Sequence, residues 1–132
     1  MDMLVSFPGG MKVNTEYKGF TIETDQPRKA GGDGGAPAPF DLFIASLGTC
    51  AGFYVLRFCQ ERDIPMDGIQ VSLGMERNPQ TRMIERIDID IDLPQEFPEK
   101  YVKAVVGAAN QCTVKKYLAA PPEIRVNSQK KA

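Results

Sequence analysis

The sequence predicts one domain over residues 1–132 that combines antiparallel strands with helices. Two observations carry this. Ile69–Glu76 and Ile87–Leu93 alternate apolar and polar residues, which indicates two strands that each bury one face. The stretch that follows Pro39 is apolar on nearly every side, which is typical of a buried helix. A chain of 132 residues is also long enough to build its own core.

The N-terminal third predicts an antiparallel meander. Met3–Phe7 is a short apolar run that ends at the turn signal Pro8-Gly9-Gly10. Met11–Tyr17 and Phe20–Thr24 are typical of strands joined by a tight turn. Asp25–Ala38 follows with four glycines and two prolines, and it lacks the Lys and Ser/Thr of a phosphate-binding loop. We therefore expect a flexible loop there.

A long helix is predicted from Pro39 to about Gln60. Proline suits the first turn of a helix, and Asp41 lies favourably near the positive end of the helix dipole. Gly48 and Gly52 are expected to let another backbone approach closely near Cys50. The uncharged part of this helix is shorter than the ~18 residues of a membrane span, and no signal peptide is apparent, so we expect a cytoplasmic protein with no membrane partner.

The C-terminal half predicts a hairpin, two shorter helices and a last strand. The two alternating segments pair as the hairpin, and the aspartates of the second one face solvent because no calcium-binding loop follows them. A helix is expected from Pro98 to near Asn110, and another from Cys112 or Thr113 through Leu118. Glu123–Val126 is typical of a final strand.

Composition excludes several classes of function. The net charge is −1, so no basic surface indicates nucleic-acid binding. The chain has no histidine, which excludes Ser–His and Cys–His catalysis within one chain. Three cysteines in a chain of this length do not indicate a secreted disulfide scaffold. No motif in the sequence indicates a cofactor or a metal site.

The three cysteines are the residues with the most distinctive chemistry. Cys50 lies within the long helix, and Cys112 lies where a helix starts, close to Lys115 and Lys116. A helix start and nearby cations favour a thiolate, so these features predict a reactive Cys112. Cys59 is nine residues from Cys50, half a revolution round the helix, and we interpret it as core. Buried cysteine is common, so all three could equally be packing residues.

Three segments resemble one family in order and spacing. They are Gly35-Ala-Pro-Ala-Pro-Phe-Asp-Leu-Phe-Ile-Ala-Ser-Leu-Gly-Thr-Cys50, Ile64–Gly68, and Asn110-Gln-Cys-Thr-Val-Lys115. The first resembles the Gly-rich loop and cysteine-bearing helix of the OsmC-like family (osmotically inducible protein C and organic hydroperoxide resistance proteins). The last resembles its Cys-Pro-Val-His motif. The acidic residue one position later than in the strict peroxidases, here Asp41, matches the less characterised branch of the family.

The resemblance implies an α+β fold with antiparallel sheets, a long buried central helix and an intertwined homodimer. It implies that Cys50 and Cys112 meet near the subunit interface. By motif, Cys50 attacks an organic hydroperoxide and Cys112 resolves the product as a disulfide, which a small dithiol reductant reopens. Asp41 is the acidic residue that the resemblance assigns to the catalytic site.

The sequence also departs from the family in the groups that activate the thiol. Phe40 stands where the strict peroxidases have Glu, Met1–Gln26 contains no Arg, Thr113 replaces Pro, and Lys115 replaces His. Arg28, Arg57 and the two lysines after Cys112 are candidate replacements. Two other functions stay open: a non-enzymatic member that binds a small apolar or thiol-bearing ligand in a buried pocket at the dimer interface, and a stress-associated protein with idle cysteines.

Overall fold

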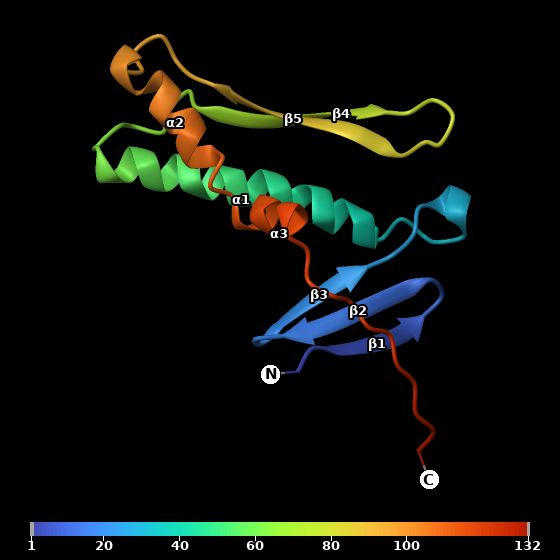
Figure 1. The fold of residues 1–132 in the computed structure, drawn as a ribbon. Coiled ribbons are helices and arrows are strands. Elements are labelled where there is room, and N and C mark those ends of the chain that lie inside the picture. The colour runs from blue at the N-terminus through green and yellow to red at the C-terminus, as the bar shows by residue number, and fades with distance from the viewer. Residues whose placement is uncertain (1, 132) are drawn as a thin grey trace. The chain divides into compact units, whose positions relative to one another are not determined.

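The computed structural model describes residues 2–131 and contains helices and antiparallel strands (Figure 1). This confirms the predicted α+β class. The chain divides within helix α1 (Pro39–Glu61) into two compact units, Met1–Ser46 and Leu47–Ala132. A compact unit is not by itself a folding domain, so the single domain predicted over residues 1–132 stays a prediction.

The first unit contains the predicted meander. Strands β1 (Leu4–Gly9), β2 (Lys12–Tyr17) and β3 (Phe20–Thr24) form an antiparallel sheet in chain order. Lys18 and Gly19 connect β2 to β3 with φ values of 53° and 80°. Two left-handed residues give the turn whose twist matches a hairpin, and glycine adopts this conformation without strain.

The glycine-rich loop after β3 is built around the carboxylate of Asp25, which is 1% exposed. Its Oδ1 accepts a hydrogen bond from the Gln26 N–H at 2.7 Å, and its Oδ2 accepts one from the Gly35 N–H at 3.0 Å. A Cβ at Gly32 would lie 2.0 Å from the Gln26 carbonyl oxygen, so only glycine fits there. The loop, which includes a short 3-10 turn at Arg28–Ala30, therefore has a defined conformation, and the expectation of a flexible loop is wrong.

The second unit contains the predicted hairpin, β4 (Gln70–Arg77) paired with β5 (Ile84–Asp92). Leu73 lies opposite Ile89 and Val71 lies opposite Ile91. The isoleucines of β5 from position 87 onward are partly buried, and the aspartates between them are exposed. This alternation confirms the solvent-facing interpretation of the aspartates.

The helices after the hairpin follow the prediction, but the last strand does not form. A 3-10 turn (η2, Glu99–Tyr101) leads into α2 (Val102–Ala109), and α3 covers Thr113–Ala119. Residues 121–131 have no regular structure, and Ile124 and Val126 are 82% and 94% exposed. The predicted strand at 123–126 is therefore wrong. A short strand needs a neighbour to share its hydrogen bonds, and within residues 2–131 the two sheets contain β1–β3 and β4–β5 with no strand paired to this segment.

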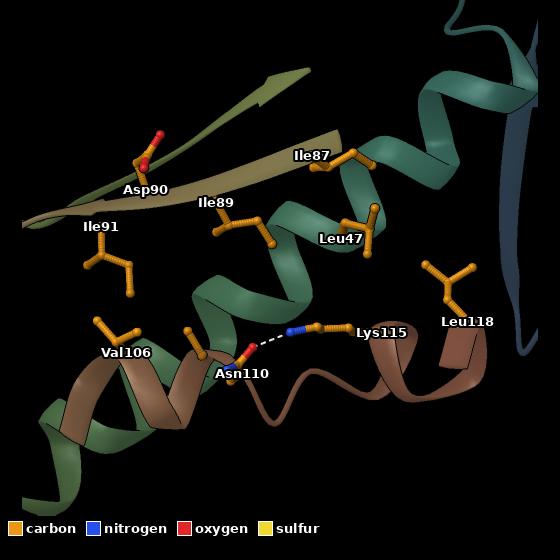
Figure 2. Close-up of a pocket in the computed structure, with 10 residues that line it drawn as sticks. Leu47, Ile87, Ile89, Asp90, Ile91, Val106, Asn110, Lys115 and Leu118 are labelled. Carbon is orange, nitrogen blue, oxygen red and sulfur yellow. Dashed lines mark hydrogen bonds between the residues drawn. The ribbon is translucent and has the colours of Figure 1, made fainter. Parts of the chain in front are cut away.

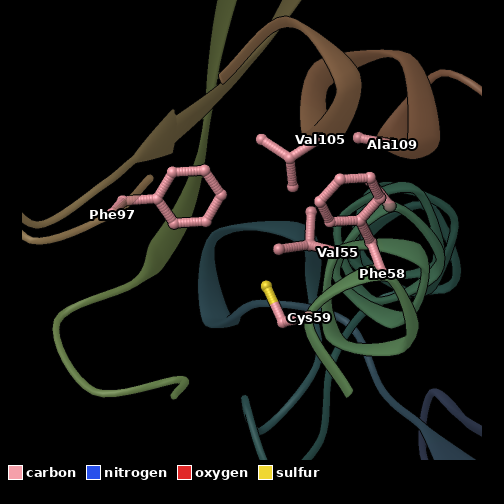
Figure 3. Close-up of a cluster of buried hydrophobic side chains, with 7 residues drawn as sticks. Val55, Phe58, Cys59, Phe97, Val105 and Ala109 are labelled. Atoms are coloured by element: carbon pink, nitrogen blue, oxygen red, sulfur yellow. The ribbon is translucent and has the colours of Figure 1, made fainter. Parts of the chain in front are cut away.

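The core of the second unit lies between one face of α1, the segment before η2, and α2 (Figure 3). Its members are Ala51, Val55, Phe58, Cys59, Phe97, Val105 and Ala109. The α1 residues follow the three- and four-residue spacing of one helix face. The rest of α1 is less covered than the sequence suggested, and Phe53 is 54% exposed. By length and composition alone α1 could also cross a membrane, a test that the core helices of soluble proteins also pass.

The two glycines near Cys50 differ. A Cβ at Gly48 would lie 3.0 Å from Cδ1 of Leu73, whereas a Cβ at Gly52 would meet no atom within 4 Å. The close approach predicted for this part of α1 therefore exists at Gly48, and it is made by a side chain of β4 rather than by a backbone. Nothing within the second unit requires glycine at position 52.

Candidate functional site

Cys50 and Cys112 come together in the second unit. Cys50 is half-buried on α1, and Cys112 is fully buried at the residue that precedes α3. The Cys112 thiol donates a hydrogen bond to the sulfur of Cys50. Both thiols are free. A helix residue and a residue that lies 62 positions later thus form one thiol pair.

Four donors, from three residues at the start of α3, act on the Cys50 sulfur. Burial alone would raise the pKa of Cys50. The backbone N–H of Val114, the Cys112 thiol, and the backbone N–H and hydroxyl of Thr113 all donate to the sulfur, and together they hold its pKa below the ordinary thiol value. Hydrogen bonds to the charged form favour that form, so Cys50 is the thiol of this pair that is poised to ionise.

Cys112 has the opposite tendency. Burial raises its pKa, and the hydrogen bond and negative charge of Cys50 raise it further, although the N–H groups of Lys115 and Val114 oppose this. The sequence argument that the helix start and the lysines make Cys112 the reactive thiolate is therefore wrong. The N–H groups that the argument relied on are present but shared: that of Thr113 donates to Cys50, that of Lys115 acts on Cys112, and that of Val114 acts on both.

A hydroxyl chain extends from this site to the surface. The Tyr54 hydroxyl lies 3.2 Å from Oγ1 of Thr113, in a position where either atom can donate, and the Thr113 hydroxyl reaches Cys50. Sequence analysis missed Tyr54. The signal was available, because Tyr54 follows Cys50 by four residues and so shares its helix face.

The second unit also contains an apolar groove of about 460 Å³ (Figure 2). Several of its lining residues are close in sequence to Cys50 or Cys112, but neither cysteine lines it. Leu47, one turn before Cys50, lines it, and at the far side the Lys115 amine donates a hydrogen bond to Oδ1 of Asn110. The other lining residues are Ile87, Ile89, Asp90, Ile91, Val106, Ala109 and Leu118. Among them, Ile87 and Ile89 project from β5 toward α1, and Asp90 points away from the groove (Figure 2). The groove suits a ligand with an apolar body and one polar group.

A family model for OsmC-like proteins matches residues 32–127. The chain is a member of the OsmC-like family. The match includes both cysteines, the hairpin and the three helical segments that follow it. The family resemblance of the sequence is thereby confirmed.

Solved structures share the fold of this OsmC-like protein. A putative osmotic stress induced and detoxification response protein from Psychrobacter arcticus matches with a TM-score of 0.71 and 24% identity, over 86% of this chain and 85% of that one. An organic hydroperoxide resistance protein OsmC from Legionella pneumophila matches with a TM-score of 0.54 and 17% identity, over 89% of each chain. A putative organic hydroperoxide resistance protein from Vibrio cholerae matches with a TM-score of 0.52 and 18% identity, over 92% and 86%. No curated protein matches in sequence.

Two of the cations that the sequence offered as activators of this OsmC-like site, Arg57 and Lys115, have other partners. Nε of Arg57 lies 2.9 Å from Oε1 of Glu61, one turn further along α1, which fits its interpretation as a charged group at the helix end. The Lys115 amine is bound to Asn110. The donors that act most strongly on Cys50 are thus backbone, thiol and hydroxyl groups rather than a cation.

Asp41 lies in the first unit, in the first turn of α1. Its Oδ2 accepts a hydrogen bond from the Ala38 N–H at 2.9 Å, which stabilises the entry into the helix. A catalytic role for Asp41 stays a prediction. Within residues 2–131, no cluster of three or more Cys, Asp or Glu side chains could hold a metal ion.

Proposed function

We propose that this OsmC-like protein is a thiol-dependent peroxidase that reduces organic hydroperoxides through Cys50 and Cys112. The observation that carries the proposal is the set of donors on the Cys50 sulfur, which lowers its pKa next to a second thiol whose pKa is raised. A thiolate is the nucleophile in thiol chemistry, and a neighbouring thiol is what resolves its oxidised form. The family assignment of roles and the two pKa directions agree.

The proposed reaction has three steps. The Cys50 thiolate attacks the terminal peroxide oxygen, the O–O bond breaks, and the departing alkoxide takes a proton to leave as an alcohol, with Cys50 now a sulfenic acid. The Cys112 sulfur then attacks the Cys50 sulfur, which forms the disulfide and releases water. A dithiol reductant finally returns both cysteines to thiols and is itself oxidised to a disulfide.

The groove supports an organic rather than an inorganic peroxide. Its isoleucine, leucine and valine side chains offer apolar surface to an alkyl or aryl group, and hydrogen peroxide has no such group. The names of two solved structures, from Legionella pneumophila and Vibrio cholerae, refer to organic hydroperoxide resistance in those proteins. Because the Glu–Arg pair of the strict peroxidases is absent from the sequence, we propose slower turnover here.

The exposed apolar surface supports a homodimer. In the first unit Leu4, Phe7 and Phe20 are 69%, 78% and 70% exposed, and in the second unit Phe53 and Leu118 are 54% and 52% exposed. Side chains of this size and number favour burial against a partner, and obligate dimers cover such surface. We propose a second copy of this chain as that partner, in the cytoplasm, where thiols are kept reduced.

Stopped-flow measurement of peroxide consumption with dithiothreitol tests the activity. We expect cumene hydroperoxide to be consumed faster than hydrogen peroxide, and Cys50→Ser to abolish consumption of both. When peroxide is added without dithiothreitol, Cys112→Ser is expected to accumulate the Cys50 sulfenic acid, because no second thiol within the protein converts it to a disulfide. Consumption that persists in Cys50→Ser would contradict the proposal.

The groove also supports the alternative function, binding without turnover. The name of the Vibrio cholerae structure refers to a molecule of captopril bound in one of its active sites, so a small molecule does occupy a site in a protein of this fold. A wild-type protein that consumes no peroxide, but that retains a small apolar ligand in both the wild-type and Cys50→Ser forms, would favour this alternative.

A further inference from the structure

We propose that Tyr54 and Thr113 form a proton relay between the Cys50 sulfur and solvent. This inference rests on the proposed thiol function and adds two residues to it. Thr113 reaches Cys50 directly, and the Tyr54 hydroxyl lies 3.2 Å from Oγ1 of Thr113 on the outer side. Tyr54 touches neither thiol in this chain of contacts, so it is a positioning residue that acts through Thr113.

The donors and acceptors of the two hydroxyls are compatible with a continuous chain to Cys50. A threonine hydroxyl has one proton, so when it donates to the Cys50 thiolate its oxygen must accept a hydrogen bond from elsewhere. Tyr54 supplies that bond. When Cys50 is a thiol, the order reverses: the thiol donates to Thr113, and Thr113 donates to Tyr54.

Ionisation of Cys50 converts one arrangement into the other. The thiol proton passes to the Thr113 oxygen, the Thr113 proton passes to the Tyr54 oxygen, and the Tyr54 proton passes to water. The hydrogen bond between Tyr54 and Thr113 is exposed, so water can accept this proton. Tyr54 also lines a shallow surface pocket with Arg57, Glu61 and Arg62. Arg57, Glu61 and Arg62 are the charged side chains of that pocket, Cys112 contacts Cys50 at the inner end of the path, and Lys115 and Lys116 follow Thr113 on α3.

Threonine replaces the family proline at position 113, and this departure supplies the hydroxyl on which the relay depends. Proline has no N–H and no hydroxyl. With threonine at this position, the residue after Cys112 offers the Cys50 sulfur two donors, its N–H and its hydroxyl. In this chain, where Arg57 and Lys115 bind other partners, these donors take the place of a cation at the thiolate.

The pH dependence of Cys50 alkylation by iodoacetamide tests the relay, in a full-length Cys59→Ala, Cys112→Ser background that leaves one thiol. We expect Thr113→Val to raise the Cys50 pKa and slow alkylation at pH 7 by about three- to tenfold, since one pKa unit is tenfold in thiolate. Thr113→Ser keeps the hydroxyl and is expected to restore the rate. Tyr54→Phe is expected to slow alkylation about two- to threefold, because it removes a hydrogen bond to Thr113 rather than one to Cys50 itself.

A double variant separates a relay from two independent effects. If Tyr54 acts only through Thr113, Tyr54→Phe adds nothing in the Thr113→Val protein. Tyr117→Phe, at an exposed tyrosine of α3, is the matched control and is expected to leave the rate unchanged. Additive effects, or an unchanged Cys50 pKa in Thr113→Val, would overturn the relay. A merely structural role would lower the melting temperature without moving the alkylation profile, and that outcome would overturn it too. Failure of the peroxidase proposal would instead appear as no peroxide consumption by the wild-type protein.

Discussion

Cys50 and Cys59 lie on the same helix, nine residues apart, yet their surroundings differ in kind. Cys59 is fully buried, and its sulfur points into the apolar cluster with Val55 and Phe97 (Figure 3). Burial raises its pKa, and the charge of Arg62 only partly opposes this. Cys50 is half-buried and receives donors from Thr113 and Val114 that lower its pKa. Burial acts on both thiols in the same direction, so the donors decide the difference.

The comparison shows that thiol reactivity on α1 is conferred by another segment of the chain. Both cysteines sit at interior helix positions, where the backbone N–H groups are already used within the helix. A free N–H must therefore reach them from another segment of the chain, and α3 begins beside Cys50. The buried side chains packed around Cys59 are apolar, and no hydrogen-bond donor to its sulfur is found among them.

The largest difference is expected in thiol labelling. At pH 7 in the folded protein, iodoacetamide should label Cys50 at least about 100-fold faster than Cys59, because Cys59 reacts only when its part of the core opens. Peptide mass spectrometry over a time course measures both sites in one sample, and the denatured protein provides the intrinsic rates. Similar rates in the folded state would show that the two environments do not differ as described.

Packing changes should affect the Cys59 region far more than exposed positions. Val55→Ala is expected to lower the free energy of unfolding by about 2 kcal/mol, because Val55 is fully buried in the cluster that contains Cys59. Val126→Ala, at a side chain that is 94% exposed, is the control and should change it by less than about 0.5 kcal/mol. Urea denaturation followed by circular dichroism gives both values, and equal effects would contradict the assigned core.

Alkaline pH should weaken the fold through Cys59. Its folded pKa is raised, so the stability that it contributes is present below the unfolded thiol pKa of ~8.5 and is lost as pH rises toward the folded value. We expect the fall in melting temperature between pH 8 and pH 10 to be smaller in Cys59→Ala than in the wild type. Because the two proteins differ only at position 59, the difference isolates Cys59. An identical fall would mean that the thiol ionises equally in the folded and unfolded states.

The smallest expected effect is a difference in stability between alanine substitutions at the two glycines near Cys50. Gly52→Ala should stabilise the helix by up to about 1 kcal/mol, because alanine is the better helix former and nothing in the second unit opposes its Cβ. Gly48→Ala should gain less or lose stability, because Leu73 must move. Thermal denaturation of the two variants measures the contrast. A loss of stability in Gly52→Ala would instead indicate that a partner chain packs against position 52.

The sequence predicted most of the fold because the pattern of each element is local. The alternation of Ile87, Ile89 and Ile91 with aspartates placed β5 and its faces correctly, and the apolar run after Pro39 located α1. The final strand failed because Glu123–Val126 has strand-like composition but no partner, and pairing is not a local property. The flexible loop failed because its order depends on one buried carboxylate, Asp25, that composition does not reveal.

The site was predictable only in part for the same reason. The two cysteines could be selected from their motifs, but which one is the stronger acid depends on where the N–H groups of Thr113 and Val114 point. Local reasoning assigned those groups to their neighbour Cys112. In the folded chain these N–H groups also reach Cys50, which lies on α1. Tyr54, also on α1, joins the site through its hydrogen bond with Thr113.

The strict alternation along β5 has one more consequence. If the hairpin slipped by a single residue, the aspartates would replace the isoleucines on the face that packs toward α1, and three carboxylates would lose their water. The free energy needed to bury these carboxylates restricts the hairpin to one register. The register therefore fixes the positions of the β5 isoleucines that line the apolar groove. A ligand must match the shape that these side chains form.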